Sequence, residues 1–253
     1  MDVDPETMTF LQNLPLFNGL AAAKRVELER NAVQHRVAPG TILFEQGEVP
    51  NFQHVILSGA VHLFGRSTAG REVLIETVEA PDLVIPAAVV MGAPYLMRAK
   101  APVSSRLLLI HAAAFRAAVA SDPALAQVVI GSLAGQFRRM VRQIKNLKLR
   151  TALQRAGCYL LALSKRQGMP GSVTLPYGKN LIASELGITR ESFSRALATL
   201  HDTGSIRVEG ETIVLLDPAR LAAECMPDAL IDDAEDVIPS LEALSSIEGK
   251  GPA

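Results

Sequence analysis

The segment of residues 179–197 constrains the fold more than any other part of this sequence. Its apolar residues repeat at helical spacing on both sides of Gly187, a residue type that readily adopts the positive φ of a tight turn. Ala183 is small where two helices must cross closely, and Thr189 stands where it can cap the second helix. We therefore predict a helix-turn-helix here, with an ordinary αα-hairpin as the alternative.

The second helix of this motif would expose side chains suited to reading DNA bases. In a helix-turn-helix, the N-terminal part of the recognition helix enters the major groove. An arginine there can bind guanine O6 and N7 together, and a glutamate can accept a hydrogen bond from cytosine N4. After the helix, residues 206–208 and 212–216 flank Gly210 and predict a β-hairpin wing. The predicted base-reading residues are Arg190, Glu191, Ser194 and Arg195.

Charge is unevenly distributed along the chain, although the formal net charge is only −1. Residues 138–207 contain thirteen bases and three acids, a balance of +10, and phosphate neutralisation requires a local excess of this kind. A charge run alone would indicate a solvated helical face, but the helix-turn-helix within it favours double-stranded DNA as a partner. Residues 217–253 contain nine acids and two bases, and predict a short helix or two followed by a disordered terminus.

The N-terminal half has a different texture, with short β-rich runs that glycines separate. Several short strands at such spacing predict an antiparallel barrel or roll. A short helix is predicted before them, over residues 18–31. The expected strands cover residues 33–37, 41–44, 54–57, 60–64, 73–78 and 106–110.

A long helix is predicted to begin after Asp122, which can cap it, with Pro123 in its first turn. Between residues 130 and 147 its apolar side chains recur at steps of 3, 4, 3, 4 and 3, the spacing of a coiled-coil seam. This seam predicts a homodimer, and a helix packed on its own domain is the alternative. A hinge near residues 147–150 and a second helix over 151–166 follow. The predicted interface residues are Ile130, Leu133, Phe137, Met140, Ile144 and Leu147.

Other protein classes have little support in the sequence. No apolar run reaches the length of a membrane span and no secretory signal is visible at the start, so we expect a cytoplasmic protein with no membrane partner. The two distant cysteines, Cys158 and Cys225, exclude a disulfide framework. We find no nucleophile elbow, P-loop, dinucleotide fingerprint or metal-ligand spacing, and we expect no enzyme. An enzyme with a regulatory domain and a scaffold with a partner-binding acidic tail are the competing classes.

With these motifs the chain resembles the Crp/Fnr family of bacterial regulators over about residues 10–220. The glycine-containing runs APG at 38–40, FEQGE at 44–48 and LSGAV at 57–61 are similar to that family's β-roll. The resemblance implies an α+β fold with an N-terminal cyclic-nucleotide-binding-type β-roll, a long dimerisation helix and a C-terminal winged helix-turn-helix. The expected domains are an effector-sensing β-roll at 1–120, a dimerisation helix and hinge at 121–150, the winged helix-turn-helix at 151–220 and an acidic tail at 221–253.

The resemblance also implies roles for residues of the DNA-binding half. Arg190-Glu191-x-x-x-Arg195 matches the base-reading residues of Crp-type members, and Glu191-x-x-Ser194-Arg195 matches those of Fnr-type members. The resemblance implies inverted repeats containing TTG as targets and RNA polymerase as a further partner. The stretch from Asn146 to Leu163 is most similar to the Dnr-type branch, which regulates nitrogen-oxide metabolism and is thought to sense nitric oxide through haem. The residues matching phosphate-binding positions are Lys179, Asn180 and Thr189.

The cassette after the predicted roll strands departs from the family's cyclic-nucleotide binders. Those members place a Gly-Glu there to hold the ribose hydroxyl, and then an Arg-Ser or Arg-Thr to hold the phosphate. Here no acid occurs between Asp82 and Asp122, and the first base is Arg98. A buried cyclic phosphate without a countercharge would be unsatisfied, so we expect that cyclic AMP does not bind.

The effector therefore stays open. The apolar cassette could accept haem or another apolar ligand, or it could be packed shut, which would leave a regulator controlled by its own abundance. Haem would need an axial ligand. We expect His35 to point inward because it alternates with Val33 and Val37, and the histidine of carbon-monoxide-sensing members is replaced near Ala87. The predicted pocket residues are Val84, Ile85, Val89, Met91, Tyr95 and His35, and the other histidine candidates, each more often a core or surface residue, are His54, His62 and His111.

Overall fold

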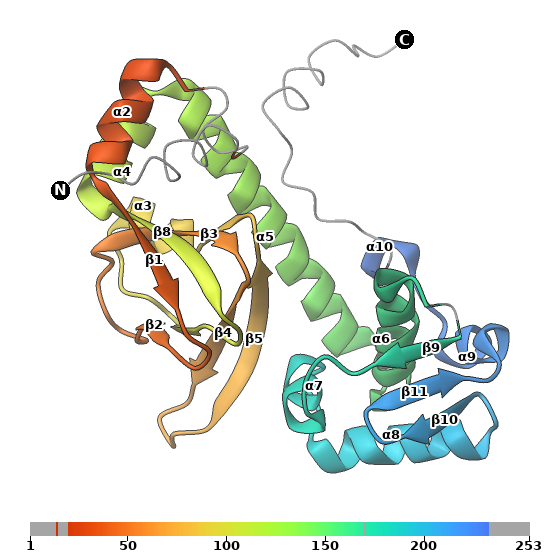
Figure 1. Cartoon of the computed structure of the whole chain (residues 1–253). Coiled ribbons are helices and arrows are strands. Elements are labelled where there is room, and N and C mark those ends of the chain that lie inside the picture. Colours follow the sequence, from red (N-terminus) through yellow and green to blue (C-terminus); the bar gives the residue numbers. More distant parts are fainter. Residues whose placement is uncertain (1–13, 15–19, 170, 233–253) are drawn as a thin grey trace, which may run out of the picture. The chain divides into compact units, whose positions relative to one another are not determined.

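The computed structural model describes residues 14, 20–169 and 171–232, which form two compact units (Figure 1). The first unit extends to Phe137 and the second begins at Arg138, so the boundary falls inside one long helix, α5 (Pro123–Leu149). The four functional regions expected from the sequence stay a prediction.

The first unit is built around two four-stranded antiparallel sheets, with strand orders β1-β8-β3-β6 and β2-β7-β4-β5. The six predicted strands are confirmed to within about two residues at each end. Sequence analysis missed β6 and β7, because a strand of three residues is too short to show periodicity. The strands are β1 (Ala32–Val37), β2 (Ile42–Phe44), β3 (Phe52–Ser58), β4 (Ala60–Arg66), β5 (Glu72–Glu79), β6 (Asp82–Val84), β7 (Arg98–Lys100) and β8 (Ser105–His111).

Two separate apolar clusters hold the first unit together. One lies between the sheets and includes Phe44, Ile56, Val61 and Leu107. The other covers the outer face of the β1-β8-β3-β6 sheet with side chains from four helices, α2 (Ala22–Arg30), α3 (Pro86–Met91), α4 (Ala112–Ser121) and the start of α5. Strand β3 is covered on both faces, which is why residues 55–57 read as a continuous apolar run rather than as an alternation.

The start of α5 agrees with its prediction. Asp122 Oδ1 accepts hydrogen bonds from the backbone N–H groups of Ala124 and Leu125, at 2.9 and 3.2 Å, and Pro123 is the first residue of the helix. In the described residues no single helix is long and apolar enough to cross a membrane. Only α4 and α5 taken together, across a bend of 110°, meet the length and composition of a span.

The second unit is a small helical domain with a three-stranded sheet in the order β10-β11-β9. The predicted wing is confirmed as the hairpin of β10 and β11, and β9 adds a strand that sequence analysis missed. The end of α5 is followed by only Arg150 and Thr151 before α6 begins, which places the break at the predicted hinge. The remaining elements are α6 (Ala152–Gln167), β9 (Ser172–Thr174), α7 (Lys179–Glu185), α8 (Arg190–Asp202), β10 (Ile206–Glu209), β11 (Thr212–Leu215), α9 (Pro218–Cys225) and α10 (Ala229–Asp232).

Candidate nucleic-acid interface

Helices α7 and α8 and the turn between them form the predicted helix-turn-helix. Gly187 in the turn has a φ of +62°, which favours glycine, and a Cβ at this position would overlap the side chain of Leu147. Ala183 is 1% exposed, as expected for a small residue where the helices cross. The turn is therefore held by a local backbone requirement and by a close contact at the same residue.

The sequence of α8 divides it into a buried face and an exposed face. Thr189 caps the helix, since its Oγ1 accepts a hydrogen bond from the backbone N–H of Ser192 at 3.1 Å. Phe193, Ala196, Leu197 and Leu200 pack into the core of the second unit. The opposite face exposes all four predicted base-reading residues, Arg190, Glu191, Ser194 and Arg195.

Two of these exposed residues are oriented by their neighbours in the first turn of α8. Hydrogen bonds from its own backbone N–H and from the Thr189 hydroxyl hold the pKa of Glu191 below its ordinary value. Arg195 Nη2 donates to Ser192 Oγ at 3.2 Å. The carboxylate of Glu191 is thus an acceptor at neutral pH, and the guanidinium of Arg195 lies one helical turn further along the same face.

The predicted phosphate-binding residues are placed at the starts of the two helices. Lys179 and Asn180 are the first two residues of α7, Lys179 half-buried and Asn180 exposed. Thr189 is exposed, but its hydroxyl already caps α8. Their positions are consistent with the prediction, because the N-terminus of a helix favours anions.

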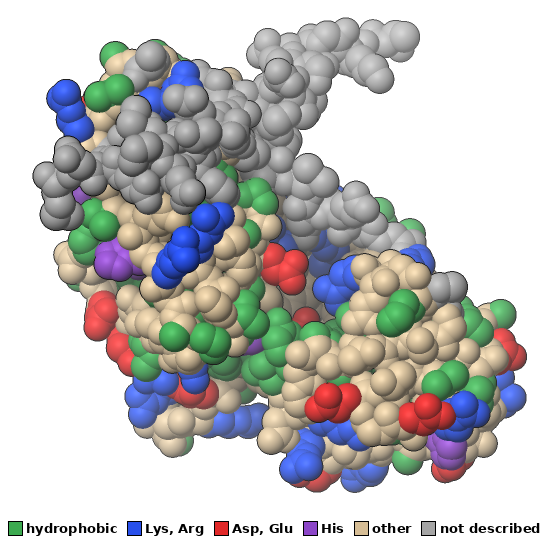
Figure 2. All heavy atoms as spheres, viewed as in Figure 1, with side chains coloured by type: hydrophobic (Ala, Val, Ile, Leu, Met, Phe, Trp, Pro, Cys, Tyr) green, Lys and Arg blue, Asp and Glu red, His purple; other side chains and the backbone are tan. Residues whose placement is uncertain are grey.

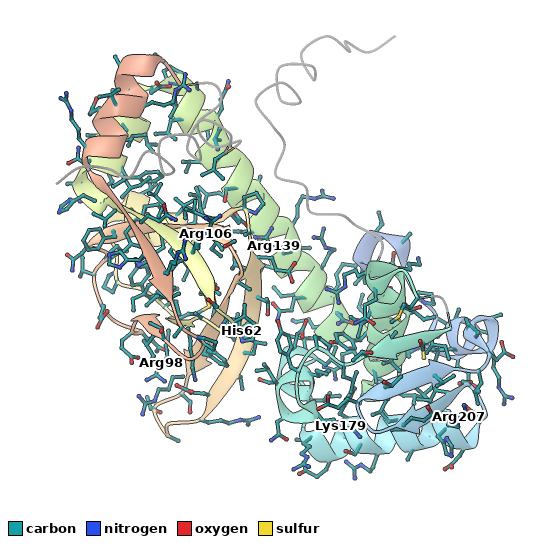
Figure 3. The ribbon with its side chains drawn as sticks, viewed as in Figure 1. His62, Arg98, Arg106, Arg139, Lys179 and Arg207 are labelled. Carbon is teal, nitrogen blue, oxygen red and sulfur yellow. The ribbon has the colours of Figure 1, made fainter. Side chains whose placement is uncertain are left out.

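Sequence analysis missed two arginines of this unit. Arg155, on α6, donates through Nη1 to the carbonyl oxygens of Leu186 and Gly187, at 2.8 and 3.3 Å, and so fastens the turn of the helix-turn-helix. Arg207, on β10 of the wing, is exposed and lies 2.7 Å from Glu209. Figure 3 labels Arg207 together with Lys179. No sequence spacing links Arg155 to a turn 31 residues away, whereas the strand alternation of the wing could have indicated Arg207.

In Figure 2 the Lys and Arg side chains gather along the edge of the second unit formed by α8 and the wing, with Asp and Glu side chains among them. A surface with mixed charges and exposed arginines suits recognition of base edges beside phosphates, because base contacts need acceptors as well as donors.

Helix α5 carries an exposed apolar stripe. Ile130 and Phe137 are 63% and 65% exposed, and Met140 and Ile144 are also exposed. Two predicted interface residues also make contacts within their own chain. Leu133 packs partly against the core of the first unit, whereas Leu147 lies against the Gly187 turn and is still 41% exposed. The stripe therefore runs through Ala134 and Val141 as well, because the face of the helix that includes Leu133 is used by its own domain.

Two family models match the chain, the cyclic nucleotide-binding domain over residues 34–122 and the Crp-like helix-turn-helix domain over residues 154–224. The chain belongs to the Crp/Fnr family. It is a DNA-binding transcription regulator of this family, with the family's β-sheet domain, long helix and helix-turn-helix in order.

Characterised relatives cover most of this Crp/Fnr regulator. A CRP-like cAMP-activated global transcriptional regulator of Mycobacterium tuberculosis is 26% identical over 82% of the chain and 94% of its own length. The nitrogen fixation regulation protein FixK of Azorhizobium caulinodans is 29% identical over 69% of the chain and 71% of its own length. The structure of FixK2 from Bradyrhizobium japonicum has a TM-score of 0.61 at 23% identity, covering 76% of this chain and 96% of that one, which supports the shared fold.

The ligand region of this Crp/Fnr regulator differs from what the sequence led us to expect. Val84, Ile85 and Tyr95 do belong to the cluster between the sheets. Val89, on the short helix α3 (Pro86–Met91), instead packs into the cluster beneath the helices, whereas its neighbour Ala88 packs into the cluster between the sheets. Met91 is 77% exposed at the end of α3. The six predicted pocket residues therefore do not line one pocket.

The prediction that His35 points inward is wrong. His35 is exposed, because β1 is an edge strand that pairs only with β8 and its neighbours do not cover the ring. His111 is exposed as well, at the end of β8. The buried histidines are His54 and His62, 6% and 3% exposed.

His54 is the histidine that would have to serve a ligand between the sheets. Its Nδ1 has no hydrogen-bond partner in the described part of the chain. Burial, with a smaller effect from His35, lowers the pKa of His54 to about 4. Its ring lies 5.3 Å from that of Phe44, which stacks on Tyr95 at 3.6 Å. The rings of Phe44 and Tyr95, which belong to the cluster between the sheets, therefore lie beside His54.

The first base of the cassette is already engaged. Arg98, on β7, lies 2.7 Å from Glu45 and 2.6 Å from Glu72 (Figure 3). The hydrogen bond to Glu45 raises the pKa of Arg98, and the same bond lowers that of Glu45. Arg98 is thus neutralised by two carboxylates.

Proposed function

We propose that this chain is a homodimeric regulator that binds inverted-repeat DNA sites through α8 of each subunit and responds to a signal other than a cyclic nucleotide. The observation that carries the proposal is the division of α8, whose buried face anchors it while its first two turns expose acceptor and donor groups together. Such a helix can enter a major groove and address base edges.

The geometry supports one assignment of base contacts. Glu191 and Arg195 can address a single G·C pair, with Arg195 on the guanine and Glu191 on cytosine N4. Ser194 is short and adjacent, so it can meet a neighbouring thymine. A half-site containing TTG follows. Arg190 either reads a second guanine or binds phosphate, in which case it adds no sequence information.

The dimer follows from the apolar stripe on α5. A soluble chain rarely leaves residues such as Ile130 and Phe137 more than half exposed on one helix without a partner surface. A two-fold dimer would place its two α8 helices on half-sites about one helical turn of DNA apart. As a transcription regulator, such a dimer is expected to contact RNA polymerase in the cytoplasm.

We exclude a cyclic nucleotide as the signal because the described residues of the expected binding region offer no free cation for its phosphate. The start of α3 offers only Ile85, Pro86 and Ala87 where a cyclic phosphate would need a cation, and Arg98 is held by two carboxylates. The packed rings around His54 favour a second candidate, a regulator that needs no small effector and acts through its own abundance. A nitric oxide signal through haem would require those rings to move.

In-vitro selection of binding sites tests the base assignment. Wild-type protein is expected to enrich an inverted repeat with one invariant G·C pair in each half-site. Arg195→Ala should relax the preference at that pair and lower the affinity for the selected site by about 1–3 kcal/mol. Arg166→Ala removes the same charge from the last turn of α6 and should leave the enriched motif unchanged. A motif that Arg195→Ala does not alter would contradict the assignment.

A further inference from the structure

The acidic segment after the wing is folded onto the second unit as far as Asp232. Leu221 and Cys225, both on α9, are fully buried. Cys225 packs so closely on α6 that a Cβ on Gly157 would overlap its Sγ. The Cys158 thiol donates to the Cys225 carbonyl oxygen at 3.4 Å. The chain that follows the wing therefore returns to α6, and its next residues form α10 beside the hinge.

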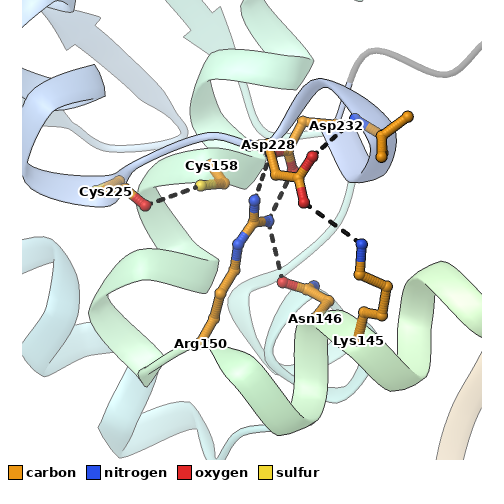
Figure 4. Close-up of polar contacts among 8 residues, drawn as sticks. Lys145, Asn146, Arg150, Cys158, Cys225, Asp228 and Asp232 are labelled. Carbon is orange, nitrogen blue, oxygen red and sulfur yellow. Dashed lines mark hydrogen bonds and ion pairs between the residues drawn. The ribbon is translucent and has the colours of Figure 1, made fainter.

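Two acids of this segment bind the residues of the hinge (Figure 4). Arg150 donates through Nη1 and Nη2 to the two carboxylate oxygens of Asp232, at 2.8 and 2.5 Å. The side chains of this pair are only 6% and 13% exposed. Arg150 Nη1 also donates to Asn146 Oδ1 at 3.2 Å, and Lys145 Nζ lies 3.4 Å from Asp228 Oδ2. We call these five residues the clasp.

The acids of the clasp also hold each other. The backbone N–H of Asp228 donates to Asp232 Oδ2 at 2.8 Å, and Asp228 Oδ1 accepts from the backbone N–H of Leu230 at 2.9 Å. The Leu230 hydrogen bond and the charge of Lys145 hold the pKa of Asp228 below its ordinary value. A two-point arginine–carboxylate pair with satisfied remaining oxygens has one geometry, so the clasp is a defined contact rather than a loose attraction.

The position of Arg150 in the chain lets its pair with Asp232 restrain the hinge between α5 and α6. It lies directly after the last residue of α5 and directly before Thr151, whose side chain caps α6. The clasp thus ties three pieces together at the hinge, namely the last turn of α5, the start of α6 and α10. Because α6 carries Arg155, which fastens the turn before α8, order at the hinge reaches the recognition helix through the fold of the second unit.

We propose that Asp228 and Asp232 clasp the hinge between α5 and α6, so that α8 is held ready for DNA without an effector having to order the hinge. The effect on DNA affinity rests on the proposed function, whereas the effect on hinge order does not. The clasp gives the acidic segment a positioning role. The expected change in DNA affinity on losing one of these acids is opposite to a simple charge effect. Loss of an acid from a DNA-binding unit would otherwise strengthen its attraction to phosphate.

The test compares full-length wild-type protein with Asp232→Asn and with Asp202→Asn. The control removes the same charge from an exposed position at the end of α8. Two quantities are measured, namely amide hydrogen exchange over residues 146–153 and affinity for a DNA site selected by the wild type. Asp232→Asn should speed the exchange and weaken DNA binding by about fivefold to tenfold, while Asp202→Asn changes neither in that direction. A charge swap, Arg150→Asp with Asp232→Arg, should restore slow exchange and affinity.

The outcomes separate the two proposals. Unchanged exchange at the hinge in Asp232→Asn, or DNA binding equal to or tighter than wild type, overturns the clasp. Faster exchange that the charge swap fails to restore also overturns it, since the pair would then not be the cause. If the wild type selects no specific DNA site, the proposed function fails, and hydrogen exchange alone still decides whether the clasp orders the hinge.

Discussion

The two units of this regulator differ in whether the charged side chains expected to bind a ligand or DNA are exposed or already paired. In the second unit, the first two turns of α8 present Arg190, Glu191 and Arg195 to solvent. In the first unit, Arg98 is neutralised by two carboxylates and His54 is buried with a pKa lowered to about 4. The arginines of α8 are therefore exposed to an external anion, whereas Arg98 is already paired with two carboxylates.

The two halves of the family's fold therefore differ in whether they keep charged residues for binding. The DNA-reading half retains the charged residues that base recognition requires, because α8 needs only its own cap and its own buried face to display them. The ligand half retains the strands but has Ile85, Pro86 and Ala87 at the start of α3. A shared fold therefore does not by itself imply a shared ligand.

The largest loss of DNA affinity is expected when the apolar stripe on α5, and with it the proposed dimer, is disrupted. Replacing Phe137 and Ile144 together by Asp should give monomers at micromolar concentration in sedimentation experiments. Their affinity for an inverted repeat should fall about a thousandfold, because two half-sites are then bound independently. Leu at both positions keeps the apolar stripe and should keep the dimer. Wild-type protein that sediments as a monomer would remove the basis of the proposed half-site spacing.

The buried His54 makes the first unit sensitive to acid. Its pKa is about 4 when folded and 6.5 in the unfolded reference, so between these values only the unfolded chain takes up the proton. The free energy of unfolding should therefore fall as the pH drops from 6.5 to 4, by about 3 kcal/mol in total, and be unaffected by this group above pH 6.5.

Urea unfolding at several pH values checks this, with His54→Leu beside wild type. The variant should lose much of the pH dependence. Part of it will stay, because burial and Lys100 also lower the pKa of His62. The exposed His111 offers a control, as His111→Gln should leave the dependence intact. An identical pH dependence in His54→Leu would show that the ring is not held neutral inside the sheets.

The smallest effect concerns phosphate contact in the second unit. Lys179→Ala should weaken binding to all DNA sequences alike, by roughly tenfold or less, and make the salt dependence shallower by about one unit. Arg195→Ala should instead act on one base pair. Titrations of selected and random DNA at several salt concentrations distinguish the two behaviours, and sequence-dependent weakening by Lys179→Ala would reassign that residue to base reading.

The parts of this molecule that could be predicted from sequence are those fixed by neighbouring residues. The Thr189 cap, the turn at Gly187 and the buried positions of α8 all lie within about a dozen residues, so local periodicity and backbone preference determine them. The same is true of Asp122 and Pro123 at the start of α5. Short elements such as α3, β6 and β7 carry too few residues to show a period, and were missed.

Other features depend on contacts between distant residues. Alternation along β1 could not show that His35 lies at a sheet edge, since strand order is a property of the whole fold. The helical repeat of α5 could not show that Leu133 is used by its own domain and Leu147 by the Gly187 turn. The pairing of Arg150 with Asp232 joins residues 82 apart, and no sequence spacing indicates it.

We infer that the second unit reads DNA while the first unit binds no cyclic nucleotide. A titration of the selected DNA site with wild-type protein, in the presence and absence of excess cyclic AMP, tests both parts together. We expect specific binding without the nucleotide and the same Kd with it. Specific binding that develops only when cyclic AMP is added would contradict it, and would mean that the cassette around α3 rearranges to hold a charge for which it shows no partner.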